Sequence, residues 1–125
     1  MTSACHCTGC QRMTSSAFSL SSMYPLDRFE VLAGEPVIGG MHGEIRHYHC
    51  PYCLSWVFTR AELLGDLVNV RTTMLDSPPA EPPFIEIYTS EALPWALIGA
   101  RHSFAQFPPM ERFQPLIAEY AAHDA

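Results

Sequence analysis

The sequence contains no lysine, and its seven basic residues are all arginine. Thirteen acidic residues outnumber them, so the formal net charge is -6. Surfaces that bind nucleic acid need clustered Lys or Arg to neutralise phosphates, and the sequence offers no such cluster. We therefore expect no nucleic acid among the partners of this chain.

Long apolar runs are missing as well. No segment approaches the roughly 18–20 apolar residues that a membrane-spanning helix requires. The first residues lack the charged and then apolar pattern of a signal peptide. We therefore expect a cytoplasmic protein with no membrane partner, in a compartment where clustered cysteines more often bind metal or do redox chemistry than form disulfides.

A chain of 125 residues with 48% hydrophobic residues is long enough for one domain with a core, here residues 1–125. Eleven prolines and seven glycines divide it into short segments. In one of them, "FIEIYT", Ile85 and Ile87 alternate with Phe84 and Glu86, as in a strand. Apolar or alternating residues predict strands at 16–20, 28–32, 44–49, 55–59, 67–75 and 84–89.

Helical patterns are scarce. Residues 60–66 predict about one turn, and the best helix is expected at 114–123. Pro115 suits its first position, and Leu116 and Tyr120 share one face. The sequence therefore predicts a small, mainly β domain with a short C-terminal helix.

The five cysteines lie in two clusters, "CHCTGC" at 5–10 and "HCPYC" at 49–53. Cys7 and Cys10 form a C-x2-C pair, and so do Cys50 and Cys53; this spacing brings two sulfurs to one point. Cys5 precedes Cys7 by two residues, which places both side chains on the same side of an extended segment. Zinc takes about four such soft or borderline ligands, so the pattern predicts a zinc-binding protein.

Other interpretations use the same residues. The cysteines could be buried structural residues. Alternatively, Cys50 and Cys53 could exchange disulfides, although a C-x2-C motif with that chemistry is expected at a strand-to-helix junction, and this pair is expected between two strands. His47 and His49 are further candidate zinc ligands. His6 alternates away from the cysteines beside it and is expected to face solvent or to lie behind the metal ligands.

The segment "CHCTGCQRMTSSAF" (5–18) closely resembles the central motif of the glutathione-dependent formaldehyde-activating enzyme family, also called the GFA or centromere protein V domain. The resemblance continues through "HCPYC" (49–53), "VNVRTTMLD" (68–76) and "ALPWA" (92–96), in the family's order. It implies a mostly β zinc protein of the kind described as a β-tent.

The resemblance also implies two zinc sites. Cys5, Cys7 and Cys10 correspond to the open, catalytic site, and Cys50 and Cys53 correspond to half of a structural site. The family's named activity adds glutathione to formaldehyde to give S-hydroxymethylglutathione, which is a carbon–sulfur lyase reaction run in reverse.

The chain departs from the family pattern at three places. Family members usually carry a β-hairpin and a first C-x-C pair before the triad, whereas four residues precede it here. A glycine commonly follows the second C-x2-C pair and another follows the triad, where this chain has Leu54 and Ser15.

If Met1 is the true start, half of the structural site is missing. Cys50 and Cys53 would then be completed by a histidine or a neighbouring subunit, share one zinc with the first cluster, or stay without metal. We expect fewer than two fully protein-ligated zinc ions per chain. We also expect a homodimer, because a missing hairpin would expose a sheet edge.

Three protein ligands leave one position on zinc for a substrate, the usual mark of a catalytic site. A small-molecule thiol such as glutathione bound there would lose its proton and become a nucleophile. Arg12 is the candidate anchor for a substrate carboxylate. The alternative function is a zinc-stabilised binding or scaffold domain without catalytic activity.

Overall fold

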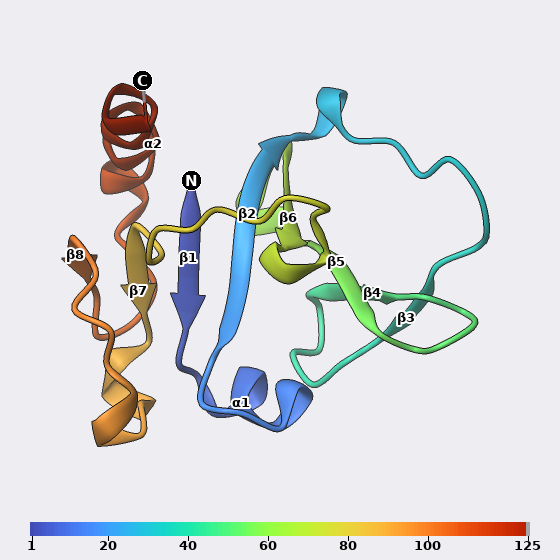
Figure 1. The fold of residues 1–125 in the computed structure, drawn as a ribbon, viewed down its shortest axis with the longest axis horizontal. Coiled ribbons are helices and arrows are strands. Elements are labelled where there is room, and N and C mark those ends of the chain that lie inside the picture. Colours follow the sequence, from blue (N-terminus) through green and yellow to red (C-terminus); the bar gives the residue numbers. More distant parts are fainter. Residues whose placement is uncertain (125) are drawn as a thin grey trace. The chain divides into compact units, whose positions relative to one another are not determined.

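The computed structural model describes residues 1–124, with side chains through residue 123. This part of the chain holds eight β-strands and two α-helices, and it is mainly β with a C-terminal helix, as the sequence predicts (Figure 1). The chain forms two compact units, one from Met1–Leu20 with Pro79–Ala125 and the other from Ser21–Pro78. That the whole chain is a single domain stays a prediction.

The first unit contains a small parallel sheet. Its strands β1 (Thr2–Cys5), β7 (Ile85–Ile87) and β8 (His102–Ser103) lie side by side, with β7 in the middle. Cys5 at the end of β1 is paired with Ile87. All three residues of β7 are buried, as is typical of parallel strands covered on both faces.

Helix α2 (Met110–Asp124) covers the core of this unit. Leu116 is 2% exposed and belongs to the same cluster as Ile85 and Ile87, and Tyr120 packs against it. The shared face of Leu116 and Tyr120 is therefore confirmed. The predicted start at Pro115 is wrong, because the apolar stripe extends back to the buried Phe113 and carries the helix with it.

The second unit is an antiparallel sheet in the order β3-β4-β5-β6-β2. Its core contains Phe58, Val68 and Val70, and Tyr48 stacks on Phe58 with ring centroids 4.5 Å apart. The strands are β2 (Ser19–Pro25, of which 21–25 belong here), β3 (Val37–Gly39), β4 (Arg46–His49), β5 (Trp56–Arg60) and β6 (Leu67–Arg71).

Five of the six predicted strands correspond to observed ones, with shifted ends. The strand predicted at 28–32 is wrong: a 3-10 turn occupies Leu26–Arg28, no strand follows until Val37, and Leu32 is 86% exposed. An alternating pattern forms a strand only where a neighbouring strand supplies hydrogen bonds, and 29–36 pairs with none. The sequence also missed β1, β3 and β8, which are two to four residues long.

The single turn predicted within 60–66 is confirmed as a 3-10 turn at Glu62–Leu64, ended by Gly65 with φ of 57°. Across the described residues, no helix combines the length and the apolar character needed to cross a membrane.

Candidate metal centre

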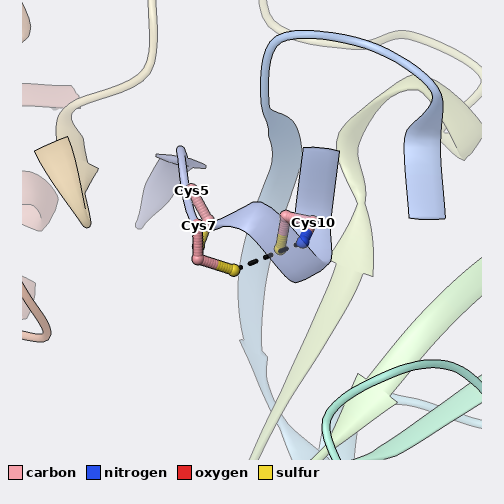
Figure 2. Close-up of side chains that lie close together, drawn as sticks. All are labelled: Cys5, Cys7 and Cys10. Carbon is pink, nitrogen blue, oxygen red and sulfur yellow. Dashed lines mark hydrogen bonds between the residues drawn. The ribbon is translucent and has the colours of Figure 1, made fainter. Parts of the chain in front are cut away.

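Three cysteine sulfurs of the first unit converge where β1 passes into helix α1 (Thr8–Thr14). Cys5 ends the strand, Cys7 caps the helix and Cys10 lies in its first turn. Their Sγ atoms all lie within 4.8 Å of one another (Figure 2). Cys10 is buried, whereas Cys5 and Cys7 are half-buried.

The local backbone explains this convergence. Cys7 is extended, with φ of -62° and ψ of 153°, and its sulfur accepts the backbone N–H of Cys10 at 3.3 Å. The helix ends at Ser15, which is left-handed with φ of 52°. Sequence reasoning missed this helix because seven residues show no apolar period and because cysteine is not among the usual N-cap residues.

A turn of the same unit, Thr89–Glu91, holds α1 in place. The Thr8 backbone N–H donates to Glu91 Oε1 at 2.8 Å. The Gln11 side-chain amide donates to the backbone oxygens of Glu91, at 2.9 Å, and of His6, at 2.7 Å. These three bonds join the strand end, the helix and the turn around the sulfurs.

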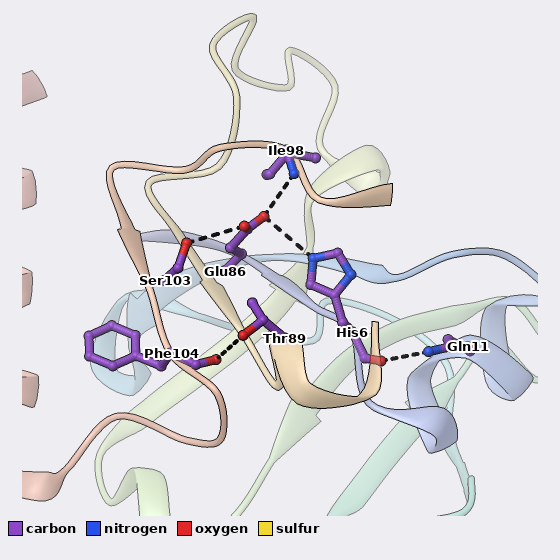
Figure 3. Close-up of polar contacts among 7 residues, drawn as sticks. All are labelled: His6, Gln11, Glu86, Thr89, Ile98, Ser103 and Phe104. Atoms are coloured by element: carbon purple, nitrogen blue, oxygen red, sulfur yellow. Dashed lines mark hydrogen bonds and ion pairs between the residues drawn. The ribbon is translucent and has the colours of Figure 1, made fainter. Parts of the chain in front are cut away.

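His6 points away from its two neighbouring cysteines and into the core of the unit. It is 0% exposed, so of the two expected positions solvent exposure is wrong, and the position behind the metal ligands remains. Its Nε2 lies 3.4 Å from Oε2 of Glu86 (Figure 3). Its ring meets that of Phe18 edge to face, with ring centroids 5.2 Å apart. The sequence analysis did not single out Glu86 as the partner of His6. The one carboxylate within the apolar run "FIEIY" was a signal that this strand carries a buried polar group.

The close packing of the thiols raises their pKa values in the chain without metal. Hydrogen bonds with Cys10 and Cys7, and then burial, raise the pKa of Cys5. The bond with Cys5 lowers the pKa of Cys10, but the bond with Cys7 and burial outweigh it and raise that pKa to about 11. Burial raises the pKa of Tyr88, and the nearby sulfurs of Cys5 and Cys7 add to this effect.

The triad fits a tetrahedral thiophilic metal. Zn–S bonds of about 2.3 Å place ligand sulfurs roughly 3.8 Å apart in a tetrahedron. The three sulfurs, within 4.8 Å of one another, need to close by no more than about 1 Å to reach that spacing. Three such ligands leave the fourth position of a tetrahedral site for another group.

Cys50 and Cys53 lie in the second unit, in a turn after β4. The turn is closed by bonds from Cys50 N–H to Ser55 O at 2.9 Å and from Leu54 N–H to Cys50 O at 2.8 Å. Cys53 is exposed, and a 3.2 Å hydrogen bond with the Ser55 hydroxyl, with further help from the Ser55 backbone, lowers its pKa.

The structure does not join His47 or His49 to this pair. Among residues 1–124, Cys5, Cys7 and Cys10 are the one group of three or more His, Cys, Asp or Glu side chains at metal-binding distances. His47 hydrogen-bonds Thr59 Oγ1 at 2.9 Å and His42 at 2.8 Å, and His49 bonds the Val37 carbonyl at 3.2 Å.

Arg12 follows the triad in the last turn of α1 and is exposed. It follows Cys10 by two residues in the same helix, and side chains at that spacing do not share a helix face. Its role as a substrate anchor stays a prediction.

Three thiols at the junction of a strand and a short helix, in a small and mainly β chain, form a cluster that could hold a metal ion. The family model described as "Glutathione-dependent formaldehyde-activating enzyme" matches residues 1–91, which is most of the chain. The chain therefore belongs to that family, as the resemblance in the sequence predicts. No curated protein matches it in sequence.

Proposed function

We propose that the chain is a zinc-dependent enzyme of carbon–sulfur lyase type that makes or breaks the adduct of glutathione with an aldehyde. The single observation that carries this proposal is the convergence of Cys5, Cys7 and Cys10, with sulfurs within 4.8 Å of one another. Membership of a family described as glutathione-dependent and formaldehyde-activating supports the thiol and the aldehyde.

Cys5, Cys7 and Cys10 would hold the zinc, and their three negative charges would leave the site with a net charge of -1. Zinc in such a site supplies an open position at which a thiol loses its proton at neutral pH. In adduct breakdown, the hydroxyl of the S-hydroxymethyl group loses its proton as the C=O bond forms. The C–S bond breaks, its electron pair goes to sulfur, and the aldehyde and thiol leave.

The chain contributes binding and orientation. Glutathione carries two carboxylates, and Arg12, exposed on the helix that bears Cys10, would bind one of them bidentately. Tyr88 and Cys5 pack against the same core cluster. Burial first, and then the charges of Cys5 and Cys7, raise the pKa of Tyr88, so its hydroxyl is protonated at neutral pH and can donate a hydrogen bond.

Cobalt(II) spectroscopy with added thiol tests this function. The cobalt-loaded chain should show thiolate-to-cobalt charge transfer, and glutathione should increase the intensity per cobalt because a fourth thiolate binds. S-methylglutathione, which has no free thiol, is the matched control and should leave the spectrum unchanged. If glutathione leaves the spectrum unchanged, and S-hydroxymethylglutathione forms from glutathione and formaldehyde no faster than without the chain, the zinc-stabilised scaffold remains as the function.

The proposal includes a cytoplasmic location and a homodimer. All five cysteines are free, which suits a reducing compartment. In the second unit, β3 is the last strand in the order and exposes Val37 and Ile38, and among residues 1–124 no strand pairs with its other edge. An exposed apolar edge strand is covered when two copies pair through it.

A further inference from the structure

We propose that Glu86 positions the thiol triad by holding the imidazole of His6, so that the two cysteines on either side of His6 direct their sulfurs toward Cys10. This inference rests on the metal site proposed above and concerns residues that are not themselves ligands. It is carried by three contacts of His6 and three contacts of Glu86, all within the first unit.

His6 links the two ligands and is held at three points. Its backbone N–H donates to Ile87 O at 3.0 Å, and its backbone oxygen accepts from the Gln11 side chain at 2.7 Å. Its side chain is 0% exposed and lies 3.4 Å from Glu86. Successive side chains of an extended segment point in opposite directions, so fixing the ring of His6 on one side fixes Cys5 and Cys7 on the other side, toward Cys10.

Burying the carboxylate of Glu86 at this position costs folding free energy. Glu86 lies in the middle of β7, is 2% exposed, and a carboxylate in such a place is tolerated only when it is hydrogen-bonded. Its Oε2 accepts the backbone N–H of Ile98 at 3.0 Å and faces His6, and its Oε1 accepts the Ser103 hydroxyl at 3.2 Å (Figure 3). The carboxylate therefore joins β7, β8 and the loop at Ile98 to the segment that bears the sulfurs.

The hydrogen bond also selects one form of the ring. A carboxylate accepts hydrogen bonds, so the Nε2 of His6 carries the hydrogen that faces Glu86. His6 Nδ1 is buried and has no hydrogen-bond partner within the described protein. The bond to Glu86 is thus the one polar contact that orients the imidazole, and its loss would free the ring to turn.

Two substitutions at Glu86 separate geometry from charge. Glu86→Met keeps the length of the side chain but removes both acceptors. Glu86→Gln keeps an acceptor for Ile98 and His6 and offers an amide donor that the Ser103 hydroxyl can accept. We expect Glu86→Met to weaken cobalt(II) affinity roughly tenfold, the size of effect typical of groups that orient ligands, and Glu86→Gln to stay within about twofold of wild type.

The spectrum at saturating cobalt(II) is the second readout. A structural role alone would lower stability and leave the spectrum of the loaded protein unchanged. Loss of positioning should lower the thiolate-to-cobalt intensity per bound metal in Glu86→Met and leave it intact in Glu86→Gln. Glu119→Met is the matched control, because it removes the carboxylate of another His–Glu pair of the same unit, His102–Glu119 at 2.8 Å, far along the chain from the sulfurs.

A double variant keeps the test decisive if Glu86→Met does not fold. His6→Leu/Glu86→Met replaces both partners of the His6–Glu86 bond by apolar groups, so the imidazole is not left unpaired, and among the described residues the only donors that lose an acceptor are Ile98 N–H and the Ser103 hydroxyl. It should bind cobalt(II) as weakly as His6→Leu alone, because Glu86 acts through His6. Wild-type affinity and spectrum in this double variant, or in folded Glu86→Met, overturn the inference. A wild-type chain without thiolate-to-cobalt charge transfer overturns the proposed metal site itself.

Discussion

The sulfur of Cys7 accepts the backbone N–H of Cys10 at 3.3 Å, so one candidate ligand also caps the helix that carries another. Strand β1, the cap and the first turn of α1 therefore form one short unit in which ligand placement and backbone structure depend on each other. The same arrangement lets substitutions at Cys7 separate metal binding from helix capping.

Cys7→Ser should abolish metal binding at the triad and preserve much of the cap, because a serine hydroxyl also accepts an N–H bond but is a poor zinc ligand. Cys7→Ala should also lose metal binding. In addition, it removes the cap, so the free energy of unfolding measured without metal should fall by ~1 kcal/mol. Metal analysis and urea unfolding in chelator measure the two effects. Undiminished zinc content in Cys7→Ser would reject the assignment of Cys7 as a ligand.

Metal affinity at the triad should rise steeply with pH. The raised pKa values of Cys5 and Cys10, the latter about 11, keep both thiols protonated at pH 7, and zinc binds their thiolates. At least two protons must therefore leave on binding, and the apparent association constant should increase at least about 100-fold per pH unit between pH 6 and 8. Competition with a chelator of known proton affinity measures this association constant at each pH. An association constant that does not change with pH would show that the thiols are already ionised.

Leu54→Gly should stabilise the chain. Leu54 has φ of 60° and is 65% exposed, so its side chain contributes little burial while its backbone is strained. Glycine removes the strain of the left-handed backbone but increases the conformational entropy of the unfolded chain. The free energy of unfolding should therefore rise by about 0.5–1 kcal/mol. Ser15→Gly, at φ of 52°, should act in the same direction.

Leu32→Gly is the control for this prediction. Leu32 is 86% exposed and is not among the residues with positive φ, so the same chemical change should destabilise the chain or leave it unchanged. Thermal unfolding of the three variants gives the comparison. Equal losses in Leu54→Gly and Leu32→Gly would mean that the left-handed backbone of Leu54 carries no strain.

The chain should hold one zinc tightly, at the triad. Two thiolates bind zinc poorly, and no described side chain joins Cys50 and Cys53 in a group of three ligands. Metal content after dialysis against a weak chelator should stay near one per chain in Cys50→Ser/Cys53→Ser and fall to zero in Cys5→Ser/Cys10→Ser. Two tightly held zinc ions per wild-type chain would contradict this.

Light scattering should show a dimer that Ile38→Lys converts to a monomer. Ile38 is 58% exposed on β3, and a lysine on an edge strand opposes pairing with a second copy. Leu63→Lys, at a 53% exposed position in the turn Glu62–Leu64, is the control and should remain dimeric. A monomeric wild-type chain would remove the homodimer from the proposed function.

The sequence alone predicted the features that depend on residues close together in the chain. Cysteine spacings of two and three residues bring sulfurs together through the local backbone, so the spacing predicted that Cys5, Cys7 and Cys10 could converge, and their sulfurs lie within 4.8 Å of one another. Alternation over five or more residues likewise predicted β5, β6 and β7. The Leu116 and Tyr120 face of α2 followed from the helical period for the same reason.

Tertiary structure decided what depends on distant partners. The run at 28–32 has strand-like residues but no neighbouring strand, and α1 is a helix without apolar period because Glu91, 83 residues beyond Thr8, satisfies its first N–H. The sequence left open whether His6 faces solvent or lies behind the metal ligands, and it is buried because Glu86, 80 residues away, lies opposite it. The sequence determined which atoms can bind a metal, since that is fixed by residue type and local spacing. Folding determined how they are held, since the hydrogen bonds that orient them come from segments that only the tertiary structure brings together.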